Sequence, residues 1–309
     1  MTTVPATPLH WRTPRGSISL DPPLVMGVLN ITPDSFSDGG ELATPTAALR
    51  RAGSMVEAGA RILDVGGEST RPGAKAVPAD EELRRILPVV ELLARELPVP
   101  LSIDTRKAEV ARQALDAGAV VVNDVSGLRH DPAMASVVAR SGAGLVLMHM
   151  RGTPADMGAH TSYRDLVEDL LAELAQSVDR ALEEGVDREA LVVDPGIGFA
   201  KTPAQSFELL NRLGELKSLG LPLLVGTSRK SFLGALLDLP VQERVTASAV
   251  SCALAWERGA RIFRVHDVRE TVEALAVVRA VVDGFPAPGS ADETDPALAG
   301  GVEKWEVEG

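Results

Sequence analysis

The chain has 309 residues, 45% of them hydrophobic, which is enough for one large domain or two ordinary ones. Its formal net charge of -12 argues against nucleic acid or an anionic membrane as the main partner, so any phosphate site has to be built locally. The single cysteine, Cys252, excludes an intrachain disulfide, and no stretch resembles a secretory signal or a membrane span, so we expect a soluble cytoplasmic protein.

The predicted elements begin with a short hairpin over residues 8–20 and continue as eight strands alternating with helices. At four places a helical segment ends in Gly and is followed by a small residue and a short strand rich in Val, Ile and Leu. These joints span residues 57–67, 116–127, 141–150 and 257–267. Four further strands are expected at 23–30, 99–105, 190–196 and 221–228. Helical patterns cover residues 45–58, 79–95, 107–117, 131–140, 163–184, 203–213, 240–258 and 267–283.

Eight strand-then-helix units over roughly 260 residues predict an α/β fold, a single (β/α)₈ TIM barrel within residues 1–285. A doubly wound open sheet is the alternative, but it would normally carry a Gly-rich dinucleotide turn after its first strand, and MGVLNITPDSFSDGG (26–40) is not one. Residues 286–309 are rich in Pro, Gly, Ala and acids, which predicts a flexible tail.

The active site of such a barrel lies at the carboxyl ends of its strands, and here those ends are polar. Asp64, Asp104, Asn123 and Asp194 would form a floor of hydrogen-bond acceptors suited to a flat heterocycle with N–H and NH₂ groups. Each acid alone could instead cap a helix or pair with an arginine. The whole set at one mouth favours a ligand, because buried acceptors without donors are costly.

Cations are expected at the last two strand ends. Arg264 and His266 are two apart and point to the same side of a strand, and residues 228–231 precede a helix start, where free N–H groups suit an anion. A basic run that only solvates a helix start is disfavoured, because cations there oppose the helix dipole.

Eight segments, in this order, resemble the motifs of the dihydropteroate synthase family over about residues 20–284. They are MGVLNITPDSFSDGG (26–40), DVGGESTRPGA (64–74), SIDTRK (102–107), NDVSG (123–127), LMHMRGTP (147–154), DPGIGFAKT (194–202), GTSRKSFLG (226–234) and RVHDVRET (264–271).

The resemblance implies a role for each matching residue. The pterin would contact Asp104, Asn123, Met148, Asp194, Lys230 and Arg264. The diphosphate would be bound by Asn30, Arg264 and His266, with Asn30 also holding Mg²⁺. Aminobenzoate would be bound by Thr70, Arg71, Pro72, Phe199, Lys230 and Ser231. Asp104, Lys230, Arg264 and His266 would be the catalytic group, and Asp64 would support the first loop or the metal.

The implied reaction joins 7,8-dihydropterin-6-ylmethyl diphosphate to 4-aminobenzoate by a Mg²⁺-assisted dissociative substitution, giving 7,8-dihydropteroate and diphosphate in folate biosynthesis. The loops 31–40 and 66–77 would close to exclude water. The resemblance also implies a homodimer and a pocket for sulfonamides. A pterin-binding methyltransferase or a non-catalytic pterin-binding paralogue remain the alternatives.

Overall fold

The structure is a computed structural model that describes residues 9–32, 44–71 and 73–284. Its centre is a closed barrel of parallel strands in the order β10-β3-β4-β5-β6-β7-β8-β9, so the predicted TIM barrel is confirmed and the open sheet is wrong. The barrel strands are β3 (Leu24–Asn30), β4 (Ile62–Gly66), β5 (Leu101–Asp104), β6 (Val121–Asp124), β7 (Gly144–Met148), β8 (Leu191–Asp194), β9 (Leu223–Val225) and β10 (Ala260–Val265).

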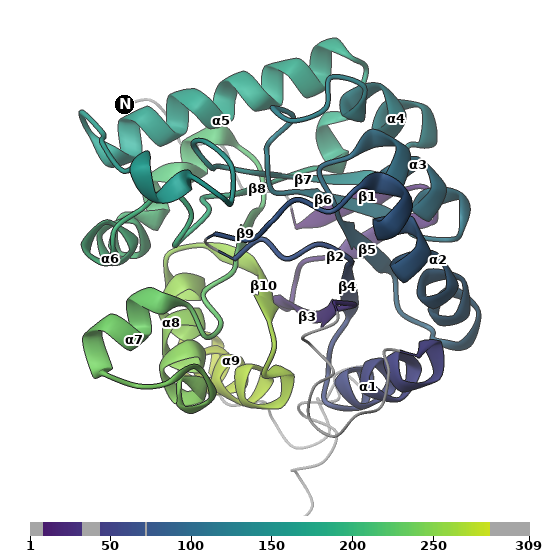
Figure 1. Cartoon of the computed structure of the whole chain (residues 1–309). Coiled ribbons are helices and arrows are strands. Elements are labelled where there is room, and N and C mark those ends of the chain that lie inside the picture. Colours follow the sequence, from purple (N-terminus) through teal and green to yellow (C-terminus); the bar gives the residue numbers. More distant parts are fainter. Residues whose placement is uncertain (1–8, 33–43, 72, 285–309) are drawn as a thin grey trace, which may run out of the picture.

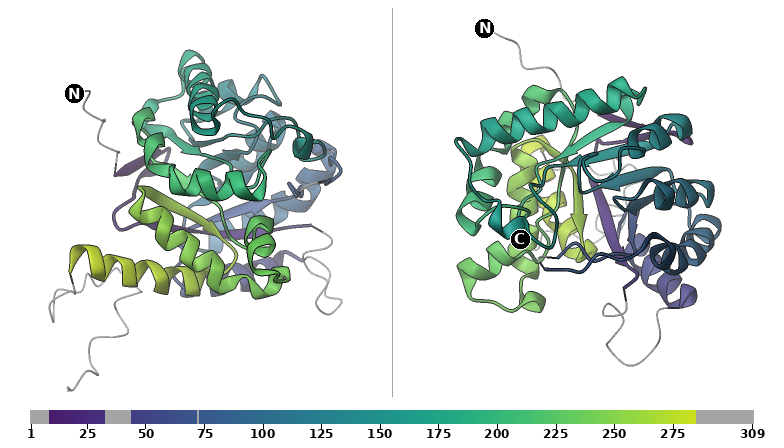
Figure 2. Two further views of the ribbon diagram at one scale, coloured as in Figure 1. Left: turned by 90° about the vertical axis from the view of Figure 1, so that its left-hand side faces the viewer. Right: turned by 45° about the horizontal axis from the view of Figure 1, so that its top comes forward.

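Helices surround the strands on the outside (Figures 1 and 2). They are α1 (Pro45–Glu57), α2 (Ala79–Glu96), α3 (Ala108–Asp116), α4 (Met134–Ser141), α5 (Leu166–Glu183), α6 (Pro203–Asn211), α7 (Ser231–Leu237), α8 (Val245–Glu257) and α9 (Val268–Asp283). Short 3₁₀ turns lie at η2 (Met157–Ala159), η3 (Arg188–Ala190), η4 (Leu213–Leu219) and η5 (Val241–Glu243). Eight of these helices match predicted ones, and α7 is an addition.

Local sequence explains where several of these helices begin. Thr202 caps α6 through a capping box with Gln205, and Pro203 occupies the first turn, where a missing N–H is harmless. At the start of α1, the side chain of Thr44 accepts a hydrogen bond from the backbone N–H of Ala47, and Pro45 occupies the first turn. This cap lacks the second, reciprocal bond of a capping box. None of the helices within the described residues is long and apolar enough to cross a bilayer.

The predicted hairpin is confirmed as β1 (His10–Thr13) paired with β2 (Gly16–Ser19). It lies against the amino-terminal end of the barrel, where the fully buried Trp11 donates a hydrogen bond from Nε1 to the carbonyl oxygen of Ala190, just before β8, at 2.8 Å. Trp11 packs with the apolar side chains that fill the barrel, among them Leu24, Ile62 and Val192. The hairpin therefore closes the end opposite the predicted site.

The strand register aligns the carboxyl ends of neighbouring strands. Asn30 of β3 lies opposite Gly66 of β4, and Gly66 lies opposite Asp104 of β5. Asp104 in turn lies opposite Asn123 of β6. The polar residues predicted at separate strand ends therefore meet at one mouth. The predicted tail (286–309), most of the first loop (33–40) and Pro72 lie outside the described residues.

Candidate active site

Arg264 organises the floor of the barrel mouth. Its Nε donates to Oδ2 of Asp64 at 2.6 Å, and its Nη2 donates to Oδ2 of Asp104 at 2.7 Å. Asn123 donates from Nδ2 to the same Asp64 oxygen at 3.0 Å. Asp64, Asp104 and Asn123 are all buried, and Oδ1 of Asp64 is buried without a hydrogen-bond partner. The floor is thus a network that still contains an unsatisfied acceptor.

The charges of this network influence one another strongly. Burial raises the pKa of Asp104, although Arg264 opposes that rise. Burial alone would lower the pKa of Arg264, but Asp64 and Asp104 outweigh it and the pKa is raised. Arg264 is therefore a permanent cation, whereas Asp104 can exchange a proton near neutral pH.

Asp194, Lys230 and Phe199 form the second part of the mouth. Asp194, at the end of β8, accepts a hydrogen bond from the backbone N–H of Gly196 at 2.7 Å, and burial raises its pKa. The ammonium of Lys230 lies 3.7 Å from the centre of the Phe199 ring, and burial lowers its pKa to about 7. The positive charges of Lys230 and Arg264 both oppose the rise in the pKa of Asp194. The two parts of the mouth are therefore coupled electrostatically.

Met148 closes the mouth on an apolar side. It ends β7 opposite Asp194 and packs in a small buried cluster with Val125, Met150 and Met157, against which Phe199 also lies. A flat ligand above the acceptors would therefore meet a soft apolar face.

His266 follows β10 and pairs with Ser228, whose Oγ lies 3.1 Å from its Nδ1. Burial and the nearby Arg264 lower the pKa of His266 to about 3, so the ring is neutral. Arg229, which follows Ser228, is held by Asp267. The expected group of cations at these two strand ends therefore contains two paired arginines, Arg264 and Arg229, the amino group of Lys230 with its lowered pKa, and the neutral imidazole of His266.

The residues predicted to bind aminobenzoate are only partly brought together. Phe199 and Lys230 are in contact, and Ser231 begins α7 with an exposed side chain. Thr70 is half-buried and Arg71 is exposed on the second loop. That loop is tied to the loop after β7 by a 2.9 Å hydrogen bond from the N–H of Gly73 to the carbonyl of Pro154.

A buried ion cluster supports the base of the second loop. Glu68 pairs with both Arg106 and Lys107, and Lys107 reaches Glu82 of α2 at 2.5 Å. Burial opposes ionisation of Glu68, but the two cations outweigh it and lower its pKa. The pair of Glu68 and Arg106 was not predicted, because nothing in the sequence indicates that these residues meet across 38 positions.

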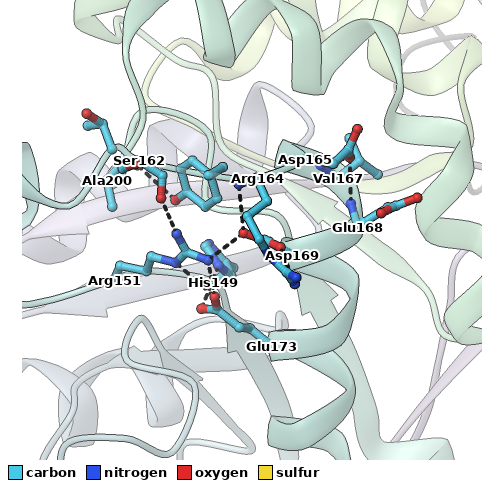
Figure 3. Close-up of polar contacts among 12 residues, drawn as sticks. His149, Arg151, Ser162, Arg164, Asp165, Val167, Glu168, Asp169, Glu173 and Ala200 are labelled. Carbon is cyan, nitrogen blue, oxygen red and sulfur yellow. Dashed lines mark hydrogen bonds and ion pairs between the residues drawn. The ribbon is translucent and has the colours of Figure 1, made fainter.

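Another cluster lies behind the loop that carries Phe199 and was not predicted. His149 and Arg151 converge on Glu173 of α5 (Figure 3). On its other side, Nδ1 of His149 lies 3.0 Å from the ammonium of Lys201. His149 and Arg151 stand at a strand end, which is a usable signal, but Lys201 and Glu173 carry no pattern that marks them.

Asn30 is the residue whose side chain could serve a metal at this mouth. Oδ1 of Asn30 and Oδ2 of Asp104 both lie beside Gly66, which has no side chain of its own to place next to them. Within the described residues, no group of three or more His, Cys, Asp or Glu could hold a metal ion. The donors present suit a hard cation whose other ligands come from a phosphate group and water.

Comparisons with known proteins agree with this geometry. The family model described as pterin binding enzyme matches residues 26–266. A dihydropteroate synthase of Synechocystis is 51% identical over 262 residues, which cover 84% of this chain and 89% of the relative. A Yersinia pestis dihydropteroate synthase solved with a sulfonamide drug superposes with a TM-score of 0.85 at 44% identity, covering 89% of this chain and 99% of that one. The Xanthomonas albilineans enzyme solved with 4-aminobenzoic acid gives a TM-score of 0.82 at 45% identity, covering 87% and 96%.

Proposed function

Because this chain belongs to the dihydropteroate synthase family of pterin-binding enzymes, we propose that it condenses a dihydropterin methyl diphosphate with 4-aminobenzoate to form dihydropteroate and diphosphate. The observation that carries the proposal is the floor of buried acceptors, Asp104, Asn123 and Asp194, arranged around Arg264 and Lys230. This arrangement matches a heterocycle that is rich in N–H donors and becomes cationic during reaction.

The pterin lies on this floor. Asp104 and Asp194 accept hydrogen bonds from its ring N–H and NH₂ groups, and Asn123 can both accept and donate. Met148 contacts one face of the ring, and Arg264 packs against the other while it stays paired with the two carboxylates. Lys230 donates to an acceptor atom of the pterin ring. The low dielectric of the buried site strengthens each of these contacts.

The diphosphate leaves toward Arg264 and His266. With Nδ1 of His266 turned to Ser228, Nε2 is free to carry the proton and to donate it in a hydrogen bond to a phosphate oxygen. Asn30 would hold Mg²⁺ together with the diphosphate. When bound, that ion would neutralise charge on the leaving group. The neutral state of His266 favours a hydrogen-bonding role over that of a second cation.

Aminobenzoate enters beside Phe199, Lys230 and Ser231, and Thr70 and Arg71 of the second loop contact it as well. The bond from the pterin methylene carbon to the diphosphate oxygen breaks, and the electron pair leaves with diphosphate. The amine nitrogen then attacks that carbon and loses a proton to solvent. The nucleophile is a neutral aromatic amine, so no side chain needs to act as a strong base.

The test is diphosphate release and dihydropteroate formation by the purified protein, given the dihydropterin diphosphate with and without 4-aminobenzoate and with Mg²⁺ or a chelator. Release that requires all three components, and that is crippled in Lys230→Ala, supports both reaction and site. Pterin binding without release would contradict the proposal. Methyl transfer from a methylated pterin would then favour a methyltransferase, and its absence a non-catalytic pterin-binding protein.

Two further properties are proposed with the function. Sulfonamides should compete with aminobenzoate, because they share its aryl amine and an acidic group. The chain should form a homodimer, for which the exposed Leu236, Val250 and Leu254 of α7 and α8 provide an apolar surface. Light scattering after gel filtration would give the mass, and a monomer at micromolar concentration would contradict the dimer.

A further inference from the structure

Glu173 of α5 is the origin of two arms of polar contacts that end on consecutive backbone carbonyls of the loop after β8, one made of hydrogen bonds and the other including a cation–π contact. In the first arm, Oε2 of Glu173 lies 3.1 Å from Nε2 of His149, whose Nδ1 lies 3.0 Å from Nζ of Lys201. Nζ of Lys201 then donates to the carbonyl of Phe199 at 2.9 Å. The arm thus crosses from a surface helix to the wall of the proposed aminobenzoate pocket.

The second arm runs through Arg151 and Tyr163. Arg151 donates from Nε to Oε1 of Glu173 at 2.8 Å, and its guanidinium lies 4.0 Å from the centre of the Tyr163 ring. The hydroxyl of Tyr163 donates to the carbonyl of Ala200 at 2.9 Å. Figure 3 shows Arg151 between Glu173 and Ser162, to whose carbonyl oxygen it donates a hydrogen bond.

The protonation states favour these directions of donation. Burial and the neighbouring Lys201 lower the pKa of His149 to about 4, so its ring is neutral and accepts at Nδ1 while it donates from Nε2. The hydrogen bond from His149, together with Arg151, holds the pKa of Glu173 well below its usual range. Glu173 is therefore a constant acceptor for both arms.

The loop between these arms needs restraint. Ala200 has a φ of 50°, in the left-handed region that costs a residue with a side chain about 1 kcal/mol or more. Its neighbour Phe199 carries the ring that lies under the ammonium of Lys230. Small rotations of this backbone would move the ring, and with it the wall that an aromatic substrate touches.

Lys201 is an unusual choice if it only fills space. It is 8% exposed, and its ammonium donates to one carbonyl and to one neutral imidazole. Burial lowers its pKa to about 7. An apolar side chain of similar length would avoid that desolvation, so stability alone does not account for a lysine here.

We propose that Lys201 is a positioning residue for the aminobenzoate pocket, holding Phe199 beside Lys230 through the arm that begins at Glu173, with Tyr163 as its counterpart on Ala200. The identity of the substrate in this inference rests on the proposed function. The claim that Lys201 and Tyr163 hold the loop after β8 in place does not. Neither Lys201 nor Tyr163 touches the reacting atoms. Their effect is on the affinity and alignment of the second substrate.

The first experiment compares Lys201→Met with the wild type and with Lys217→Met. The control removes a lysine charge from η4, before β9 and so at the other end of the barrel. In Lys201→Met we expect KM for 4-aminobenzoate to rise by roughly tenfold, with KM for the dihydropterin diphosphate changed less than about twofold. Lys217→Met should leave both unchanged. Equal changes in the two KM values, or none, would overturn the proposal.

The second variant, Tyr163→Phe, removes one hydroxyl and keeps the ring on Arg151. It should raise the same KM by about threefold, in line with a single lost neutral hydrogen bond. If Lys201→Met does not fold, Tyr163→Phe decides: an unchanged KM for aminobenzoate would overturn the proposal.

Hydrogen–deuterium exchange of the full-length protein separates the inference from the proposed function. Both variants should exchange faster in peptides covering residues 195–202 and not in peptides from β3 or α9. If the wild type makes no dihydropteroate, the function has failed, and faster exchange still supports the bracing role. Unaltered exchange in both variants would contradict the bracing role, whether or not the wild type makes dihydropteroate.

Discussion

Arg264 on β10 donates a 2.7 Å hydrogen bond to Asp104 on β5, a residue 160 positions earlier in the chain. The same guanidinium binds Asp64 at 2.6 Å, so one side chain neutralises two buried carboxylates from different strands. The pairing links the two sides of the barrel mouth. It also makes Arg264 a structural residue as well as a ligand-facing one.

Replacing Arg264 by methionine should therefore destabilise the fold. The change leaves Asp64 and Asp104 buried without their cation, and breaking a buried pair from one side costs about 3–5 kcal/mol. Urea denaturation at pH 8 would measure the loss. Arg140→Met, which removes an exposed arginine on α4, is the matched control and should change the unfolding free energy much less. Equal losses in the two variants would contradict the pairing.

Pterin affinity should depend on pH, because two carboxyl groups of the site have raised pKa values. Burial raises the pKa of Asp104 to about 7 and that of Asp194 to about 6. Each group is then still largely protonated in mildly acidic solution, and it becomes a full acceptor only as the pH rises through its own pKa. Binding of a dihydropterin should strengthen between about pH 5.5 and 7.5 and level off above that range.

Calorimetric titration with a dihydropterin that lacks the diphosphate checks this, because the ligand then brings no titrating phosphate. Asp194→Asn is the informative variant, since it removes one of the two titrating groups and should flatten the lower part of the profile. A wild-type affinity that is constant from pH 5 to 8 would show that neither carboxyl titrates in this range.

The ion cluster under the second loop should contribute stability that acid removes. Glu68 has a lowered pKa in the folded chain, so its pairs with Arg106 and Lys107 stabilise fully above its unfolded value of about 4.5. That contribution is lost as the pH falls through the lower, folded value. Glu68→Gln should cost about 3 kcal/mol at pH 7, and the cost should shrink below pH 4.5.

Urea denaturation of Glu68→Gln at pH 7 and at pH 4 gives the comparison. Glu81→Gln is the control on the neighbouring helix, where Glu81 pairs with Arg84 and Arg85 at a more exposed position. It should cost less at both pH values. A Glu68→Gln penalty that is the same at both pH values would mean that the cluster acts through shape and not through charge.

Much of the fold could be predicted because its signals are local and repeated. The Gly at four helix ends precedes a buried strand each time, and Gly59 and Gly259 have φ values of 103° and 105° that favour glycine. Helix α7 was missed for the converse reason. It has only seven residues, and the last two of them, Leu236 and Leu237, are exposed, so it shows no clear apolar face.

The site could be predicted as a set of residues but not as a set of bonds. Barrel geometry alone places strand-end residues at one mouth, which is why Asp104, Asn123 and Asp194 were correctly grouped there. Which acid pairs with Arg264 depends on barrel closure over 200 positions. Lys201 and Glu173 were missed because their partnership through His149 exists only once α5 has packed beside β7.

The hairpin under the barrel provides a test of how separable stability and activity are. Trp11 is fully buried, fills the amino-terminal end of the barrel and donates to Ala190. Trp11→Ala should lower the unfolding free energy by about 3–5 kcal/mol, since truncating a large core side chain leaves a cavity. Val281→Ala on α9, where the side chain is 78% exposed, is the control and should have little effect.

The site lies at the opposite strand ends, so kcat per folded molecule of Trp11→Ala, measured well below its melting temperature, should match the wild type. A reduced kcat in fully folded Trp11→Ala would mean that packing at the closed end shifts the strand ends that carry Asp104 and Arg264.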